Sequence, residues 1–396
     1  MDNPKIPLFK VFMSEDAPTE VGKVLMSGFV GEGPQVEKFE RTLKTYFCND
    51  NLVTLNSATS ALQLTLHLLK KPTNYIESSF KNDSQLTEWP GLHKGDEVLS
   101  CPLTCTATNW PILANNLHIK WVDVDSDTCN MCLDDLENKI SKKTKVIMLV
   151  HWGGNPIDLD RIEQIRQKCK DKYGFSPMVI EDCAHGFGSE YKGKKLGSTK
   201  HNNFTIYSFQ AIKHLTSVDG GCLILPDNRF YKRAKLLRWY GIDREDNKKD
   251  FRCENDISEW GFKFHMNDVC ATIGLTNFKH IETIIEKHRQ NAKYYNDNLK
   301  NLDNIKLITN NDNLSSYWVY TLKVKNQKRF ISMMESKGIA VSRIHERNDK
   351  HSCVTQYKTS LPKLDKLVNE MICIPVGWWL SKEEREYIVK SIKEGW

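Results

Sequence analysis

The sequence predicts an α/β protein, with a large domain built on a mostly parallel sheet flanked by helices and a smaller α+β domain after it. Short apolar runs alternate with helical spacings of apolar residues between residues 52 and 182. Such alternation is typical of a parallel sheet with helices on both faces. After residue 301 the pattern changes to shorter, mixed elements. We therefore expect a large domain over 1–260, and connecting helices with a small domain over 261–396.

Composition narrows the class of protein. The chain has 396 residues, of which 40% are hydrophobic and 27% charged, with a net charge of +6. This balance is typical of globular proteins, and the length allows a large core in two domains. The basic residues are scattered, which does not indicate nucleic-acid binding. No run approaches the roughly 18 apolar residues of a membrane span. We expect a cytoplasmic protein with neither nucleic acid nor membrane as a partner.

The cysteines predict no disulfide or metal framework. There are twelve, and Cys129-x-x-Cys132 is a single pair without a second pair at zinc-site spacing. We interpret them as reduced thiols and expect no metal, with a zinc site as the alternative.

The elements follow from periodicity and turn residues. We expect helices over 18–26, 36–47, 61–69, 104–113, 133–140, 160–173, 229–240 and 329–337, one or two long helices over 269–299, and a last helix from residue 381. We expect strands over 52–55, 97–101, 119–124, 146–150, 178–180, 204–207, 222–225, 317–324, 339–344 and 372–374. The polar stretches 72–95 and 243–255 are expected to be a surface excursion and a charged loop.

One lysine lies in an unusual place. Lys213 falls between two apolar runs expected to be buried strands, just before the turn signal Asp219-Gly220-Gly221. A lysine whose stem runs along the surface is the ordinary alternative. The sharper interpretation is an amine held in a cleft to form a Schiff base. Asp182 ends an earlier apolar strand, 31 positions before it (213 − 182). An amine and a carboxylate are what pyridoxal phosphate (PLP) needs for its aldehyde and its ring nitrogen.

A second strand end predicts an anion site. Asn56-Ser57-Ala58-Thr59 joins the strand over 52–55 to a helix. The free N–H groups at the start of a helix bind phosphate well, although an ordinary Ser/Thr N-cap is the alternative. Ser57, Asp182 and Ser208 all fall at the carboxyl ends of strands, where ligands bind in such sheets. No dinucleotide-binding or P-loop glycine motif is present, so NAD and nucleoside triphosphates are not expected.

Taken together, these motifs resemble a known family. The chain is similar to the fold-type I PLP enzymes of the DegT/DnrJ/EryC1/StrS group, which aminate nucleotide-linked sugars, over roughly residues 6 to 392. The motifs that carry the resemblance are Ser208-Phe209-x-x-x-Lys213 with Asp219-Gly220-Gly221, Glu181-Asp182-x-Ala184-His185, Asn56-Ser57-Ala58-Thr59, Gly31-x-Gly33-Pro34 with Phe39-Glu40, and Val150-His151-Trp152-Gly153.

The resemblance implies roles for these residues. Lys213 would bind the cofactor covalently and later move the proton. Asp182 would pair with the ring nitrogen, and His185 would lie near the phenolic oxygen. The phosphate would be held by the backbone of Ala58 and Thr59, beside Ser57, and by Ser208. Residues 261–267 would reach the phosphate of the other subunit in a homodimer with shared sites.

The chain departs from the family pattern at two places. Cys105 stands where the family often has an aromatic residue stacked on the ring, so another group must cover that face. Lys263 stands where the family often has Asn, with His265 nearby. Both could contact phosphate as cofactor-binding residues, and a solvated basic face is the alternative.

The resemblance implies a transaminase. L-glutamate would supply the amino group, and a nucleotide-diphosphate 4-keto-6-deoxy sugar would receive it, giving a 4-amino-4,6-dideoxy sugar nucleotide of the viosamine or perosamine type. The alternatives are a 3-amino sugar transaminase, a related sugar dehydratase, which a histidine in place of Lys213 would favour, and a regulatory scaffold that keeps the fold. The candidate substrate-binding residues are Phe29, Trp152, Arg238, Arg343 and His345.

Overall fold

The computed structural model describes residues 5–71, 89, 91–244, 256–309 and 313–396. Most of the expected excursion at 72–95 and of the loop at 243–255 lies outside these residues.

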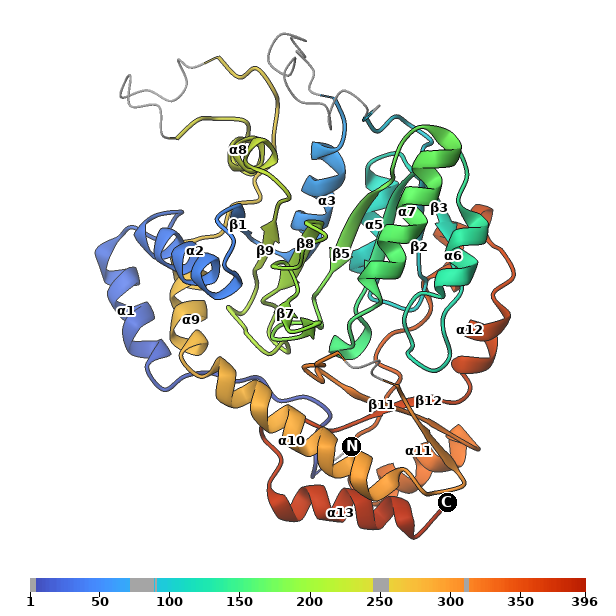
Figure 1. Ribbon diagram of the computed structural model, residues 1–396. Helices are drawn as coiled ribbons and strands as arrows, with labels where there is room; N and C mark the ends of the chain where they lie inside the picture. The colour runs from blue at the N-terminus through green and yellow to red at the C-terminus, as the bar shows by residue number, and fades with distance from the viewer. Residues whose placement is uncertain (1–4, 72–88, 90, 245–255, 310–312) are drawn as a thin grey trace.

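A mostly parallel sheet forms the centre of the large domain, as predicted. Within the described residues it has seven strands in the order β1-β9-β8-β5-β4-β2-β3 (Figure 1). Only β9 runs antiparallel to its neighbours β1 and β8. The strands are β1 (Leu52–Leu55), β2 (Glu97–Ser100), β3 (His118–Trp121), β4 (Thr144–Val150), β5 (Met178–Asp182), β8 (Phe204–Ser208) and β9 (Gly221–Ile224).

Helices cover both sides of this sheet (Figure 1). Helix α3 packs on β8, β9 and α5, whereas α6 packs on α7. The helices are α1 (Ala17–Ser27), α2 (Pro34–Phe47), α3 (Ala58–Leu68), α5 (Thr106–Ala114), α6 (Leu133–Lys139), α7 (Leu159–Tyr173) and α8 (Asn228–Leu237). A two-stranded hairpin, β6 (Glu190–Tyr191) with β7 (Lys194–Lys195), follows β5. The strands of the seven-stranded sheet are buried along most of their length, which agrees with their apolar runs.

The C-terminal part has its own sheet and its own core. Strands β10 (Ile305–Leu307), β11 (Tyr320–Val324) and β12 (Met371–Ile374) pair antiparallel. Its helices are α10 (Ile281–Leu299), α11 (Gln327–Ser336), α12 (Pro362–Leu367) and α13 (Lys382–Lys393). Tyr295, Phe330 and Ile388 belong to a second cluster of buried apolar side chains. Helix α9 (Asp268–Phe278) packs instead on α1 and α2. The domain boundary at 260/261 stays a prediction.

The first described residues form an extended arm that reaches the small domain. Ile6 makes an isolated bridge with Ile339, and Pro7 O accepts a hydrogen bond from the indole of Trp379 at 3.1 Å. The strand predicted over 339–344 is wrong. Only isolated bridges occur there, at Ile339 and at Ser342, because the arm and β12 each pair with a single residue of the segment. The described residues contain no helix long and apolar enough to cross a membrane.

The topology places the candidate residues on one edge of the sheet. Strands β1, β8 and β5 run in the same direction, so Leu55, Ser208 and Asp182 end at that edge. The antiparallel strand β9 starts there with Gly221. The edge therefore gathers the loops that carry Ser57, Lys213 and His185.

Candidate active site

Lys213 lies on the loop between β8 and β9. The loop is closed by backbone bonds from Phe209 N to Gly220 O and from Ser217 N to Phe209 O, both 2.9 Å. These bonds hold Lys213, which is partly buried, over the carboxyl edge of the sheet. Burial lowers the pKa of Lys213 to about 8, and the nearby Asp182 and Cys105 act in the opposite direction. A lysine with that pKa can act as base or acid near neutral pH.

Asp182 is buried at the end of β5. Its Oδ2 accepts a hydrogen bond from Thr108 Oγ1 at 2.7 Å, and its Oδ1 accepts one from Ala184 N at 3.0 Å. Burial raises the pKa of Asp182, although these two bonds and the charge of Lys213 oppose the rise. A buried carboxylate of this kind favours a cationic partner. Asp182 and Lys213 form no direct ion pair within the described part of the chain.

An aromatic cluster lies beside Lys213. The ring of His185 stacks on the indole of Trp318, with centroids 3.9 Å apart and planes at 17°. His345 lies nearly parallel to His185 at 5.6 Å, and Trp152 meets both histidines edge-on. The Nζ atom of Lys213 lies 3.6 Å from the centroid of the Trp318 ring. Burial keeps the pKa of both histidines below the usual value, so their rings are neutral.

The loop from β1 to α3 forms a cradle at the same edge. Ser57 is the N-cap of α3, and its Oγ accepts from Ser60 N at 3.0 Å. Gly221 is directly paired with Ser208, and a Cβ on Gly221 would lie 2.6 Å from Ala58 N. The approach therefore requires glycine and places Ser208 beside the start of α3. This cradle suits a phosphate group.

The segment after residue 260 runs along this cradle. Phe264 O accepts from Asn56 N at 2.7 Å, and Lys263 O accepts from Asn56 Nδ2 at 3.2 Å. Lys263 is exposed, whereas the ring of His265 packs on Trp239 with centroids 3.6 Å apart. Burial lowers the pKa of His265 to about 4, so it is neutral at pH 7. Within one subunit the segment adjoins its own Asn56, and its reach into a second subunit stays a prediction.

Arg238 does not face a substrate site. It is 4% exposed, and its guanidinium binds Glu40, Glu32 and the carbonyl of Thr54. Because these acceptors satisfy the side chain, the prediction of a diphosphate contact there is corrected to a structural ion pair inside the large domain.

The remaining substrate candidates are spread over the molecule. His345 and Trp152 belong to the aromatic cluster beside Lys213, and the indole N–H of Trp152 donates to Thr321 Oγ1 at 3.0 Å. Arg343 lies two residues from His345 and donates to Glu346 at 3.0 Å and to Val368 O at 3.3 Å. Phe29 is 79% exposed on the loop after α1 and is far from being enclosed in one subunit.

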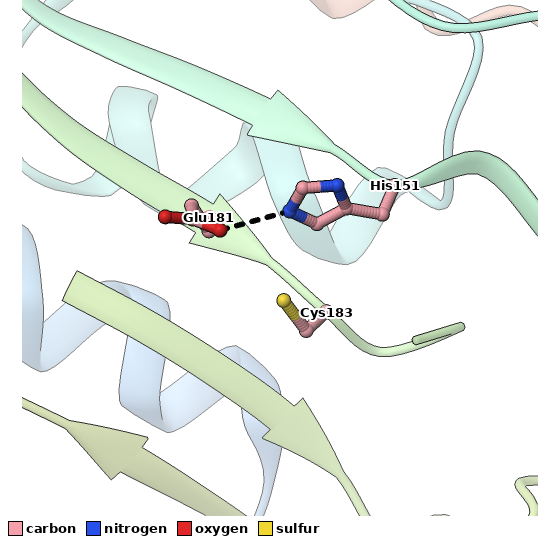
Figure 2. Close-up of side chains that lie close together, drawn as sticks. All are labelled: His151, Glu181 and Cys183. Atoms are coloured by element: carbon pink, nitrogen blue, oxygen red, sulfur yellow. Dashed lines mark hydrogen bonds and ion pairs between the residues drawn. The ribbon is translucent and has the colours of Figure 1, made fainter. Parts of the chain in front are cut away.

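Three possible metal ligands meet beneath the site. The ligand atoms of His151, Glu181 and Cys183 lie within 4.8 Å of one another (Figure 2). His151 Nδ1 accepts from Ile157 N at 3.1 Å, so its Nε2 carries the proton and donates to Glu181 at 3.0 Å. Burial keeps the pKa of Cys183 high and the thiol protonated. Both imidazole nitrogens are thus engaged, and the group ties the loop after β4 to β5.

Two residues escaped the sequence analysis. Thr108 orients Asp182 from helix α5, and Trp318 comes from the segment before β11, 105 positions after Lys213 (318 − 213). A threonine in a helix and a tryptophan before an apolar strand carry no local signal of function.

The gathered residues fit the cofactor that the sequence predicts. A buried carboxylate suits the cationic ring nitrogen, the amine of Lys213 suits the aldehyde, and the α3 cradle that Gly221 leaves open suits the phosphate. The cradle lies at the ends of β1 and β8, and the carboxylate lies at the end of β5, which neighbours β8. Strand β9 runs between β1 and β8.

Comparisons with known proteins give one consistent result. The profile of the DegT/DnrJ/EryC1/StrS aminotransferase family matches residues 12–393. The chain is 43% identical to AtS13 from Actinomadura melliaura, whose crystal structure superposes with a TM-score of 0.91 over 100% of both chains. It is 40% identical to the sugar aminotransferase CalS13 from Micromonospora echinospora, with a TM-score of 0.88 over 99% of this chain and 100% of that one. It is 30% identical, over 75% of this chain and 70% of the relative, to a UDP-4-amino-4-deoxy-L-arabinose–oxoglutarate aminotransferase from Shewanella sediminis.

Proposed function

Because this chain belongs to the DegT/DnrJ/EryC1/StrS aminotransferase family, it is a sugar aminotransferase that depends on PLP, and we propose that it aminates C4 of a nucleotide-linked sugar. The amino donor is L-glutamate, the acceptor is a 4-keto-6-deoxy sugar on a nucleotide diphosphate, and the product is a 4-amino-4,6-dideoxy sugar nucleotide. The Shewanella relative supports this choice, because its printed name joins a 4-amino sugar nucleotide to oxoglutarate.

The observation that carries the proposal is the arrangement of Lys213 and Asp182. Both side chains lie at the carboxyl edge of the sheet. Burial raises the pKa of Asp182 and lowers that of Lys213, so in each case it favours the neutral form. Neither is neutralised by direct pairing with the other, so the site keeps an acid and an amine available for a bound group.

When bound, PLP supplies an electron sink at the reacting carbon. The Nζ of Lys213 takes the proton from the α-carbon of glutamate in the first half of the reaction. It delivers a proton to the sugar carbon that bears the new amine in the second half. Asp182 would hold the proton on the ring nitrogen, and Thr108 and the N–H of Ala184 fix the direction of its carboxylate. The neutral His185 would serve the cofactor as a hydrogen-bond partner rather than as a charge.

The anionic parts of the ligands have separate places. We assign the cofactor phosphate to the α3 cradle, with Ser57, Ala58, Thr59 and Ser208. We assign the sugar acceptor to the side that Trp152, Arg343 and His345 border. Arg343 is the one cation among these three, and its contact with Val368 O is long enough at 3.3 Å to be exchanged for a diphosphate oxygen. Its partner Glu346 is an exposed surface residue, so their ion pair is weak.

The proposal includes a homodimer. Exposed apolar side chains gather at the end of α1 and on the loop after it, which is tied to α9 because Asp268 accepts from Gly33 N at 2.9 Å. The members are Leu25, Met26, Phe29 and Val30, between 44% and 88% exposed. A second copy of the chain is the occupant we propose for this surface, with Lys263, His265 and Phe29 beside the partner's site.

The proposal also keeps two finer expectations. We place the domain boundary at 260/261, and we place the enzyme in the cytoplasm, because eleven of its twelve cysteines are free thiols in the described chain and thiols suit a reducing compartment.

Incubation with L-glutamate and a panel of UDP-, dTDP- and GDP-linked 4-keto-6-deoxy sugars tests the function. We expect a product in which the keto oxygen is replaced by an amino group and a hydrogen, as its mass will show, with the nitrogen at C4 by NMR. Amination at C3, loss of a hydroxyl without amination, or no conversion of any sugar would each contradict the proposal.

A mixing experiment tests the shared site. Lys213→Ala and Lys263→Glu are each expected to be inactive as homodimers. After the subunits are exchanged, mixed dimers contain one intact site, so about a quarter of wild-type activity returns. Activity in Lys263→Glu alone, or no recovery on mixing, would rule out a phosphate contact from the partner.

A further inference from the structure

Trp318 is in direct contact with the side chain that performs the proton transfer. The Nζ of Lys213 lies 3.6 Å from the centroid of its ring, well inside the range of a cation–π interaction. Trp318 is 2% exposed, so water does not compete for this face of the indole. The contact joins a large-domain lysine to a residue that comes just before the first long strand of the small domain.

The indole cannot move freely relative to the lysine. Its Nε1 donates a 2.9 Å hydrogen bond to the carbonyl of Ile212, the residue directly before Lys213. Its backbone N donates to Gly153 O at 2.9 Å, and His185 stacks on its ring at 3.9 Å. Through its indole and its backbone, Trp318 therefore contacts the lysine loop, the loop after β4 and the loop after β5.

Two buried histidines bond to the two residues that precede Trp318. His214 Nε2 donates to Ser316 O at 3.1 Å, and His288 Nδ1 donates to Tyr317 O at 2.8 Å. Burial lowers the pKa of both rings, so they stay neutral and keep donating these bonds across the working pH range. The segment that carries Trp318 is thus bonded to both sequence neighbours of Lys213, Ile212 and His214.

We propose that Trp318 is a positioning residue whose indole seats the Lys213 amine whenever that amine is not bonded to the cofactor. This inference rests on the role proposed above for Lys213. The lysine must leave the cofactor when the donor binds and must then wait, correctly placed, for its two proton transfers. The indole gives the amine a defined place near Asp182, and it interacts more strongly with the ammonium than with the free amine.

The seat also affects when Lys213 gains and loses its proton. Asp182 from β5 and Cys105 from the start of α5 favour the ammonium. His185, His214 and His345 face the same side chain but are neutral, so they add no charge. The π face of Trp318 also favours the ammonium, so we expect its removal to lower the pKa of Lys213.

The test is competitive labelling of the enzyme loaded with pyridoxamine 5′-phosphate, the form in which the amine of Lys213 is free. The labelling of Lys213 by 1-fluoro-2,4-dinitrobenzene is followed against pH by peptide mass spectrometry. The variants are Trp318→Leu, which removes the π face, and Trp318→Phe, which keeps one. The control is Trp396→Leu, because Trp396 also donates its indole N–H to a backbone carbonyl, that of Lys325 at 2.7 Å, and lies at the end of the small domain.

In the wild type we expect Lys213 to titrate near pH 8. In Trp318→Leu we expect the midpoint to fall by about 1 pH unit, the size of a desolvated cation–π interaction. Trp318→Phe should fall between the two, and Trp396→Leu should match the wild type. An unchanged midpoint in Trp318→Leu overturns the proposal, and so does an equal shift in Trp396→Leu.

A second measurement uses the wild-type protein and does not depend on the folding of a tryptophan variant. The ammonium over the indole should quench or shift the emission of Trp318, so tryptophan fluorescence should change with the same midpoint as the labelling. Lys213→Met should lack this transition, and its presence there would refute the seat. These readouts need no sugar substrate. A normal titration in an enzyme that aminates no sugar would reject the proposed function alone, whereas C4 amination with no shift in Trp318→Leu would reject the seat alone.

Discussion

Two groups of ionisable side chains in the large domain differ in whether their members form direct ion pairs. Arg238 is in direct contact with Glu40 and Glu32, and Glu40 also accepts from the N–H and the hydroxyl of Thr54. Asp182 and Lys213 lie at the carboxyl edge of the same sheet without a direct ion pair between them in the described structure. The first group is satisfied within the protein, and the second leaves its charges for a ligand.

The pKa shifts of the two groups also differ. Burial alone would raise the pKa of Glu40, but Arg238 and Thr54 bring it below its usual value. Burial would lower the pKa of Arg238, but Glu40 and Glu32 raise it. At the other group burial prevails, since the pKa of Asp182 rises and that of Lys213 falls to about 8. Direct pairing keeps both partners charged and contributes to stability. Without a direct pair, burial brings the pKa values closer to neutral pH, where proton transfer can take place.

The largest expected effect is the loss of activity on substitution of Lys213. We expect Lys213→Ala to lower the amination rate by at least about 10³-fold, because it removes both the covalent link and the proton carrier. The unfolding free energy should change by less than about 2 kcal/mol, since no ion pair is lost and the contact removed is the cation–π interaction with Trp318. Rates and urea titrations of this variant are compared with Lys38→Ala, an exposed lysine of α2. A large loss of stability would mean that Lys213 is structural.

At the satisfied group the expected effect is on stability. Glu40→Ala leaves the guanidinium of Arg238 buried with one acid fewer, and breaking such a pair costs about 3–5 kcal/mol of unfolding free energy. Glu37→Ala, on the same helix but with a side chain 71% exposed, should cost less than about 0.5 kcal/mol. Equal denaturation midpoints for the two variants would contradict the structural role assigned to Arg238.

Asp182→Asn sharpens the comparison, because it keeps the shape and removes only the charge. The enzyme should still bind PLP and keep the visible absorbance of the lysine-bound cofactor, since Lys213 is unchanged. Turnover should fall on the order of 10²-fold, because the ring nitrogen loses its anionic partner. Thr108→Val, which removes one hydrogen bond to the same carboxylate, should cost less. Undiminished turnover in Asp182→Asn would refute the assigned role.

The last expected effect is a dependence on pH. The enzyme loaded with pyridoxamine phosphate must have Lys213 as the free amine to take a proton from the reacting carbon. Below the pKa of about 8 the rate of a single turnover with the keto sugar should therefore rise about tenfold per pH unit, and above it the rate should level off. A rate that is flat between pH 6 and 9 would show that another group is the base.

The sequence predicted the parts of the site that lie on neighbouring strand ends. Ser57, Asp182 and Lys213 each follow an apolar run, and parallel strands bring such positions to one edge without further information. Most helices and strands were found for the same reason, because strong periodicity predicts the type of element well. The strand at 339–344 failed, since an apolar run does not tell a paired strand from a segment that makes only isolated bridges.

Contacts made across the chain were out of reach. Nothing in Arg238 itself distinguishes a guanidinium that binds Glu40 from one that binds a diphosphate, because its partner lies 198 positions away in sequence. Trp318 resembles any core tryptophan until its distance to Lys213 is known. Such pairs depend on how helices and domains pack, and a single sequence read by itself carries no record of that packing.

The origin of Trp318 in the C-terminal part has a consequence for how the protein is made. A nascent chain that has left the ribosome as far as β9 already holds Lys213, Asp182 and the α3 cradle. It still lacks the indole of Trp318, on which the ring of Phe9 from the arm stacks at 5.1 Å in the complete fold. The lysine therefore reaches its final surroundings only after residue 318 has been made, later than the other parts of the large-domain site.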